Sequence, residues 1–303
     1  MGEPRSELAR AKVNLALCVT GRRAHGYHEL DSLVVFPELG DVITAEAAGT
    51  LSLTLEGPFG AELGAGPENL VLRAAEMLAG GKRGVALHLT KALPVASGIG
   101  GGSADAAAAL RLLSRLWRVP LPDLGALARL GADVPVCVHS RAARIQGIGD
   151  RLEPLDLPGF WLVLCNPGQK LQTGRVFAGL RTIRGTRLEP ARPPETLDGL
   201  VTWLFGQRND LEDPAVGLAP AIADVLRAMR AQSGCRIARM SGSGATCFGL
   251  FAGEAAAIAA SEAIRKAEPR WWTVAGPVFR RPPHSGPEEG LPRPVPEGLP
   301  GEA

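Results

Sequence analysis

The chain has 303 residues, of which 46% are hydrophobic and 21% charged, and its formal charge is +2 at pH 7. This composition predicts a globular protein of about two domains, and the even spread of charge argues against a nucleic-acid-binding face. No apolar run is long enough to span a membrane. The five cysteines form no CxxC pair, which argues against a disulfide framework or structural zinc and favours a reducing, cytoplasmic location.

The first half of the chain is predicted to be rich in strands. Two segments alternate apolar and polar residues at period two, TLSLTLE at 50–56 and GVALHLT at 84–90, which is typical of half-buried strands. Less regular patterns predict further strands at 9–17, 30–36 and 41–47. The apolar spacing of residues 69–79 predicts a helix between them.

A glycine-rich loop and a strong helix come next. The helix is predicted over residues 104–117, with Ser103 as its N-cap, because apolar residues recur at helical spacing. A short helix at 123–130 would end at Gly131. Residues 144–155 are interpreted as two short strands around a glycine turn.

The second half mixes strands and helices without regular alternation, which favours an α+β class over a doubly wound sheet. Its predicted elements are a buried strand at 161–165, a helix at 219–232, a glycine turn at 241–244, a strand at 246–251, a helix at 254–266 and a last strand at 271–274. Residues 281–303 are rich in Pro, Gly and Glu, lack periodicity and are predicted to be a disordered tail.

Two glycine loops are the local signals for ligand binding. The first glycine loop, residues 94–103 (PVASGIGGGS), can turn backbone N–H groups toward an anion at the start of a helix. It lacks the GK[ST] ending of a Walker loop and the GxGxxG of a dinucleotide fold. The second glycine loop, residues 240–246 (MSGSGAT), can add more N–H groups. The alternatives are a structural glycine turn and a hairpin turn.

At these motifs the sequence resembles the GHMP small-molecule kinases. The segment 94–107 (PVASGIGGGSADAA) is similar to their phosphate loop, although Ala104 replaces the second serine of many members. Within that superfamily the chain resembles the 4-diphosphocytidyl-2-C-methyl-D-erythritol kinases over residues 9–280. The motifs with this resemblance are AKVNL at 11–15, GRRAHGYHELD at 21–31, GADVP at 131–135, QGIG at 146–149, NPG at 166–168, NDLE at 209–212 and the second glycine loop.

The resemblance implies roles for individual residues. Asp133 would accept the proton of the substrate hydroxyl, and Lys12 beside it would neutralise charge on the moving phosphoryl group. Viewed singly, each residue is better explained by a structural role, Asp133 as a helix cap and Lys12 as an exposed strand lysine. The ATP phosphates would lie on Pro94, Gly98, Gly100, Gly101, Gly102 and Ser103.

Substrate contacts follow from the same resemblance. Asn14 would hold the methylerythritol end, Tyr27 and His28 would bind cytosine, and Phe177 would stack on its other face. The alternatives are core packing for Tyr27 and Phe177, and a surface pairing of His28 with Glu29 or Asp31. Contacts to the substrate are also expected from Thr173, Gly242 and Gly244.

The implied fold is the two-domain GHMP kinase fold, with domains at 1–155 and 156–280 and the active site in the cleft between them. ATP is the expected cofactor, together with Mg²⁺, for which Ser103 is one possible ligand and no carboxylate cluster is evident. The implied partner is a small-molecule substrate, neither a nucleic acid nor a membrane, and the protein would be a monomer or homodimer. Alternatives are a kinase for homoserine, mevalonate or a sugar, and a GHMP-fold ligand sensor without turnover.

Overall fold

The computed structural model describes residues 5–24, 26–81, 84–190 and 192–280. The tail predicted at 281–303 lies outside these residues. Helices and strands are mixed along the described chain without regular alternation, so the predicted α+β class is confirmed. None of the helices in the described ranges has the length and apolar character needed to cross a membrane.

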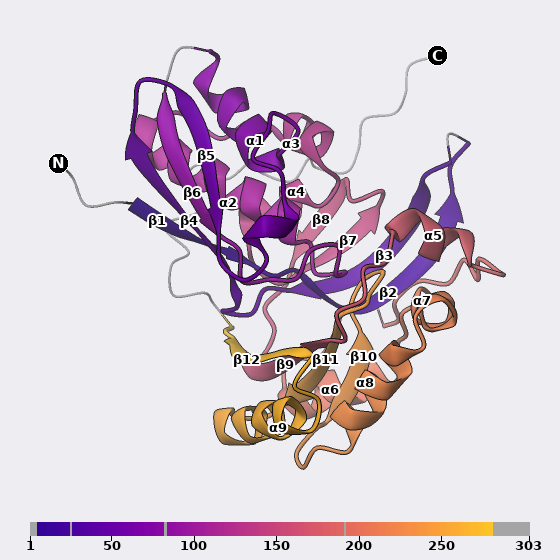
Figure 1. The fold of residues 1–303 in the computed structure, drawn as a ribbon. Helices are drawn as coiled ribbons and strands as arrows, with labels where there is room; N and C mark the ends of the chain where they lie inside the picture. Colours follow the sequence, from indigo (N-terminus) through magenta and orange to yellow (C-terminus); the bar gives the residue numbers. More distant parts are fainter. Residues whose placement is uncertain (1–4, 25, 82–83, 191, 281–303) are drawn as a thin grey trace, which may run out of the picture.

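The described N-terminal half contains β1 (Arg5–Arg10), β2 (Val13–Arg22), β3 (His28–Val35), β4 (Gly40–Ala47), β5 (Leu51–Glu56), the 3₁₀ turn η1 (Gly60–Glu62), α1 (Leu70–Ala79), β6 (Val85–Thr90), α2 (Gly101–Trp117), α3 (Leu124–Leu130), α4 (Val134–His139), β7 (Ala143–Gly147) and β8 (Arg151–Pro154). The C-terminal half contains β9 (Phe160–Asn166), α5 (Thr173–Ala178), α6 (Leu197–Phe205), α7 (Glu212–Leu218), α8 (Ala221–Arg230), β10 (Ile237–Met240), β11 (Cys247–Phe251), α9 (Glu254–Ala267) and β12 (Trp272–Val278). Figure 1 shows their arrangement.

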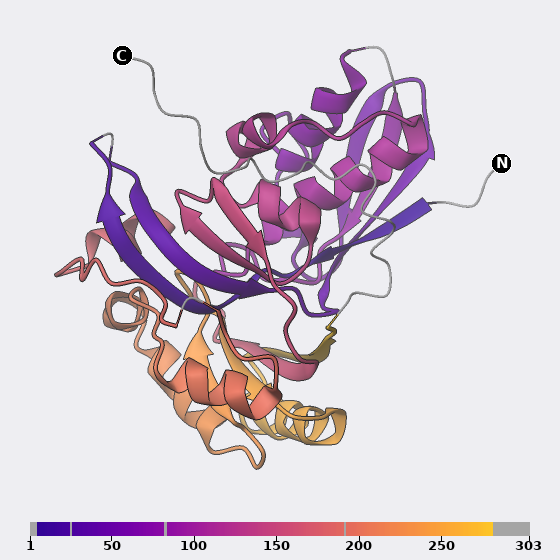
Figure 2. The same cartoon turned by 180° about the vertical axis from the view of Figure 1, so that it is seen from behind.

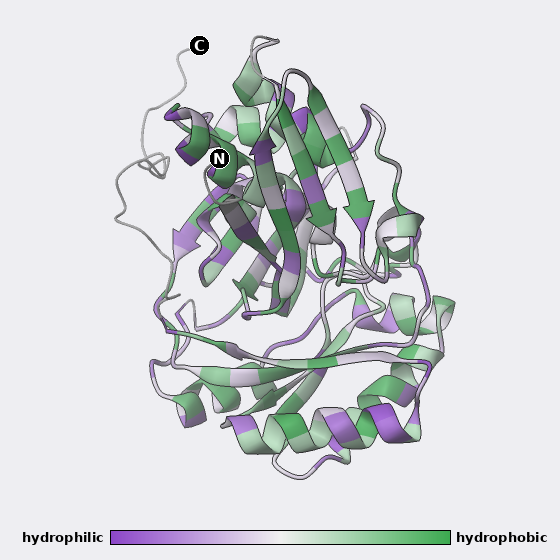
Figure 3. Cartoon of the chain, turned by 60° about the vertical axis from the view of Figure 1, so that its left-hand side comes forward, coloured by the Kyte–Doolittle hydropathy of each residue, from purple (hydrophilic) through white to green (hydrophobic). Residues whose placement is uncertain are grey.

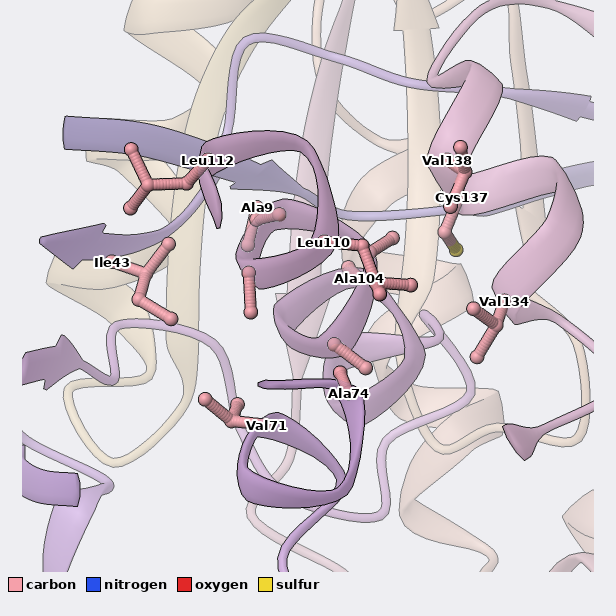
Figure 4. Close-up of a cluster of buried hydrophobic side chains, with 14 of the residues drawn as sticks. Ala9, Ile43, Val71, Ala74, Ala104, Leu110, Leu112, Val134, Cys137 and Val138 are labelled. Carbon is pink, nitrogen blue, oxygen red and sulfur yellow. The ribbon is translucent and has the colours of Figure 1, made fainter. Parts of the chain in front are cut away.

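A first sheet, in the order β1-β4-β6-β5, packs against α1 and α2. Its strands pair antiparallel except β5 and β6, which run parallel. Side chains from the sheet, α1, α2 and α4 meet in one apolar core, part of which is shown in Figure 4. The alanines at 106–109 are fully buried, because their small side chains let α2 approach its neighbours closely.

A second sheet, in the order β2-β3-β7-β8, lies between the first sheet and the C-terminal half. A third sheet, in the order β10-β11-β9-β12, belongs to the C-terminal half. Leu15 and Leu33 of the second sheet share an apolar cluster with Phe160, Leu162 and Phe248 of the third. The two halves are therefore joined by a common core as well as by the chain.

Helices α8 and α9 pack on the third sheet. In α8 the buried residues are Ile222, Val225, Leu226 and Met229, and their spacing places them on one face of the helix. Figure 3 shows hydrophobic stretches alternating with hydrophilic ones along strands and helices, as expected when each element has one buried face.

Two predicted elements were placed wrongly. The strand predicted at 9–17 is two strands, because the backbone N–H of Ala11 bonds to Leu39 and that of Lys12 bonds to Ile99 in the first glycine loop. Helix α2 begins at Gly101 instead of residue 104. Gly100 adopts a φ of 64° and accepts the first helical hydrogen bond from Ala104, so Ser103 lies inside the first turn and is not the N-cap.

Candidate active site

A cleft of about 1570 Å³ opens between elements of both halves. From the N-terminal half it is lined by Lys12, Asp133, the first glycine loop and the turn between β2 and β3. From the C-terminal half it is lined by the start of α5 and part of the second glycine loop. Most of the predicted site residues therefore face one space.

Lys12 and Asp133 form an ion pair beside this cleft, with 2.9 Å between Lys12 Nζ and Asp133 Oδ2. The lysine side chain is 9% exposed and the carboxylate 40%, so the carboxylate is the more accessible partner. Asp133 precedes α4 but makes no side-chain capping bond. Asp133 therefore occupies the N-cap position without capping α4 through its side chain, and Lys12 is not an exposed strand lysine.

The first glycine loop ends at the start of α2. The first backbone N–H groups of a helix have no partner within the helix, and the first three residues of α2, Gly101, Gly102 and Ser103, all line the cleft. Gly100 has a positive φ of 64°, a backbone conformation that favours glycine. A Cβ there would also lie only 3.2 Å from Cβ of Lys12. This backbone can hold an anion within reach of the Lys12 side chain.

The second glycine loop packs directly on the first. A Cβ on Gly98 would lie 2.5 Å from the carbonyl oxygen of Ser241, so no side chain fits there. The Ser241 hydroxyl donates to the carbonyl of Gly98 at 3.0 Å and accepts from the backbone N–H of Asn14 at 3.0 Å. Gly242 borders the cleft, whereas the predicted residue Gly244 is not among its lining residues.

Asn14 lies deep in the cleft. Its amide nitrogen donates to the hydroxyl of Ser32 at 2.7 Å. Its Oδ1 atom is buried and has no hydrogen-bond partner in the described part of the chain. Since a buried polar atom normally has a partner, this oxygen is suited to accept a hydrogen bond from a ligand.

The predicted cytosine-binding residues also line the cleft. The rings of His28 and Phe177 stack with their centroids 4.6 Å apart, and Tyr27 is 63% exposed. Burial, together with the nearby Arg22, lowers the pKa of His28, so this ring is neutral at pH 7. The core-packing alternative for Tyr27 is therefore wrong, whereas Phe177 is partly buried against the C-terminal core.

The surface pairing considered for His28 is also not seen. Glu29 pairs with Arg23, and Asp31 pairs with Arg144. The hydroxyl of Thr173, at the start of α5, lies 3.0 Å from that of Ser243 in the second glycine loop.

Comparisons with known proteins agree with this geometry. The family models for the GHMP kinase N-terminal and C-terminal domains match residues 69–150 and 198–270. A 4-diphosphocytidyl-2-C-methyl-D-erythritol kinase of Cereibacter sphaeroides is 56% identical over 273 residues, covering 88% of this chain and 96% of that protein.

The chain belongs to the 4-diphosphocytidyl-2-C-methyl-D-erythritol kinase family of GHMP kinases. A crystal structure of a 4-(cytidine 5'-diphospho)-2C-methyl-D-erythritol kinase superposes with a TM-score of 0.75 at 39% identity, covering 91% of this kinase and 99% of that chain. A homoserine kinase from Cytophaga hutchinsonii reaches a TM-score of 0.60 at 18% identity, covering 92% and 95%, and shares the fold alone.

The predicted family and the GHMP kinase fold are thus confirmed. As a GHMP kinase the protein is an ATP-dependent enzyme acting on a small molecule, and the alternative of a ligand sensor without turnover is not favoured. The alternative of a homoserine, mevalonate or sugar kinase is not favoured either.

Sequence reasoning missed several polar residues that line the cleft, and also Ser241, which is next to the lining residue Gly242 in the chain. Ser241 and Ser243 lie in the second glycine loop, where only the glycines were considered, and both hydroxyls bridge to other segments. Lys91 and Asp105 also border the cleft. Lys91 lies three residues before Pro94, and Asp105 lies two residues after Ser103. Their place on either side of the first glycine loop was the sequence signal that could have identified them.

Proposed function

We propose that the protein uses Mg²⁺ and ATP to phosphorylate the 2-hydroxyl of 4-diphosphocytidyl-2-C-methyl-D-erythritol, in the non-mevalonate route to isoprenoid precursors. The observation that supports this most directly is the Lys12–Asp133 pair, which faces the same cleft as the first glycine loop and the turn with Tyr27 and His28. The relative from Cereibacter sphaeroides, named for this substrate, is the second support.

In the proposed reaction the substrate hydroxyl lies against Asp133. The oxygen of the substrate hydroxyl attacks the γ-phosphorus of ATP. The bond between the γ-phosphorus and the bridging β-phosphate oxygen breaks, and ADP leaves. Asp133 accepts the hydroxyl proton. Lys12 keeps the carboxylate oriented and offsets the charge of the phosphoryl group in transit, since positioning and electrostatic stabilisation supply most of the catalysis in phosphoryl transfer.

The ATP phosphates would bind to the first glycine loop, from Pro94 and Gly98 to the free N–H groups at the start of α2. In the described ranges no group of three His, Cys, Asp or Glu side chains is placed to hold a metal ion. Magnesium would therefore be held chiefly by the phosphates, with the Ser103 hydroxyl as its protein ligand. When bound, the ion would offset charge on the phosphates.

The acceptor would extend from Asn14 to the turn between β2 and β3. The unpartnered oxygen of Asn14 would accept a hydrogen bond from the methylerythritol part. Cytosine would lie against Tyr27, with the neutral His28 ring bonded to its edge. Phe177, which stacks on His28 in this structure, would turn away from that ring to close the other face of the base. Thr173 and Gly242 would contact the diphosphate, and Gly244 would act by fixing the loop.

We also propose the domain boundaries, the cellular location and the oligomeric state. The domains would extend over 1–155 and 156–280, with the cleft between them. The location would be cytoplasmic, in keeping with five free thiols in the described residues. The assembly would be a monomer or homodimer.

A coupled assay of ADP release tests the reaction. We expect turnover with 4-diphosphocytidyl-2-C-methyl-D-erythritol and none above background with homoserine, mevalonate or galactose. Phosphorus NMR of the product should locate the new phosphate on the 2-hydroxyl. Turnover of one of the other acceptors alone would refute the proposed substrate, and binding of the acceptor without ADP release would refute the proposed activity.

A further inference from the structure

Lys91 has the largest side chain that is fully buried in the described residues, with 2% exposure. It follows directly after β6 and is three residues from Pro94, where the first glycine loop begins. Its ammonium group is held between two carboxylates, those of Asp41 and Asp105, which are equally buried. A buried charge of this kind requires partners, and both come from other elements.

Asp41 connects this lysine to the start of the loop. One carboxylate oxygen of Asp41 binds Lys91 Nζ. The other accepts from the backbone N–H groups of Ala92 and Leu93, at 2.6 and 2.8 Å. The two residues immediately before Pro94 are therefore fixed to β4.

Asp105 connects the same ammonium to the end of the loop. It belongs to α2, and its Oδ2 lies 2.9 Å from Lys91 Nζ. A Cβ on Gly101 would lie only 3.0 Å from Nζ, so the ammonium lies beside the first residue of α2, and a side chain there would have to displace it. One buried group thus joins both ends of the first glycine loop.

Stability alone does not explain such a network. Removing three charges from water is unfavourable, and apolar residues of similar volume often stabilise a core equally well. Burial, opposed by Lys91, raises the pKa of Asp105 to about 8. The network is therefore close to charge balance at neutral pH, with Lys91 paired to Asp41 and hydrogen-bonded to Asp105.

We propose that Lys91 is a positioning residue for ATP. Through Asp41 and Asp105 it sets the distance between the start of the first glycine loop and the start of α2, so that the N–H groups of residues 101–103 converge on the phosphates. This inference rests on the proposal that the ATP phosphates bind to this loop. The hydrogen bonds of the network join β4, residues 91–93 and α2, and none of its three side chains is a proposed acceptor contact, so acceptor binding should not depend on it.

The matched variants Asp105→Ala and Asp105→Asn test the connection to α2. Both remove a carboxyl group that burial keeps largely protonated, and both leave the pair of Lys91 with Asp41 intact, but only asparagine keeps an acceptor for the ammonium. We expect Asp105→Ala to weaken ATP binding about 10-fold, less than the roughly 10²-fold loss of rate that a 1 Å misplacement of reacting groups can cause. Asp105→Asn should bind ATP nearly as the wild type does. Calorimetric Kd values for ATP and for the acceptor, with melting curves, supply the readouts.

Lys91→Met should weaken ATP binding at least as much, with the acceptor Kd unchanged. If that variant does not fold, the two Asp105 variants decide alone, because neither leaves an unpaired buried charge. Equal ATP affinity in Asp105→Ala and Asp105→Asn would overturn the proposal, as would parallel losses for ATP and acceptor. Wild-type protein that binds no ATP would instead refute the proposed function.

Discussion

Asp133 differs from Lys12 in exposure, and this difference bears on catalysis. The lysine is almost fully buried against the first glycine loop, whereas the carboxylate is open to the cleft. A hydroxyl in the cleft can therefore reach the carboxylate without displacing the lysine. A general base must lie within hydrogen-bond reach of the proton it removes, and this arrangement leaves Asp133 free to do so.

Replacing Asp133 by asparagine keeps the shape but removes the proton acceptor. We expect kcat to fall about 10²–10⁴-fold, the usual contribution of a general base. The Kd for ATP should change little, because Asp133 lies outside the first glycine loop. Steady-state kinetics measures kcat, and titration with nucleotide measures the Kd for ATP.

Asp123 supplies the control for that experiment. Its carboxylate caps α3 by accepting from the backbone N–H of Ala126 at 2.7 Å. Asp123→Ala should lower the unfolding free energy by about 0.5–2 kcal/mol and leave kcat unchanged. If Asp133→Asn behaved in the same way, Asp133 would not be the base.

His28 is expected to set the preference for cytosine over uracil. Only the edge of the base differs between the two, and the neutral imidazole can both donate and accept there. His28→Ala should therefore reduce the ratio of affinities for the cytidine and uridine forms of the substrate. Tyr27→Ala is the contrasting variant: loss of stacking, worth about 1–3 kcal/mol per base, should weaken both forms without altering the ratio. An unchanged ratio in His28→Ala would contradict this role.

At the scale of elements, the sequence predicted those strands and helices that a local hydrophobic pattern determines. Strands β5 and β6 were predicted from alternation and α1 from helical spacing, because each has one buried face. Helices α8 and α9 were also predicted. The short helices α5, α6 and α7 and strand β10 were missed. These elements are four to nine residues long, and their contacts with other segments, rather than local periodicity, stabilise them.

In the candidate site, too, some features were predicted from local sequence and others were not. Its motif residues were found because they are contiguous in sequence, as in the first glycine loop. The break between β1 and β2 was not predicted, because it depends on a hydrogen bond from Lys12 to Ile99, which is distant in sequence. The contacts of Lys91 with Asp41 and Asp105 are likewise visible only once the chain is folded. Sequence patterns therefore identified the segments that line the cleft but not the contacts that hold them in place.

At the scale of the whole molecule, the cleft depends on how firmly the two halves are joined. Strand β2 belongs to the N-terminal half, yet its backbone also bonds to the segment before α7: Leu17 donates to Arg208 and accepts from Asp210. The second and third sheets share one apolar cluster. The halves should therefore unfold together.

Leu15→Ala tests this coupling, because Leu15 is fully buried in the shared cluster. Truncating a buried leucine lowers the unfolding free energy by about 2–5 kcal/mol. If the halves are coupled, calorimetry should show one transition, shifted to lower temperature as a whole. Leu112→Ala, in the separate core around α2, should shift the same single transition. Two transitions, of which each variant moves only one, would show that the halves unfold independently. In the coupled case saturating ATP should raise the single midpoint of both variants, since a ligand that binds only the folded protein stabilises everything that unfolds with its site.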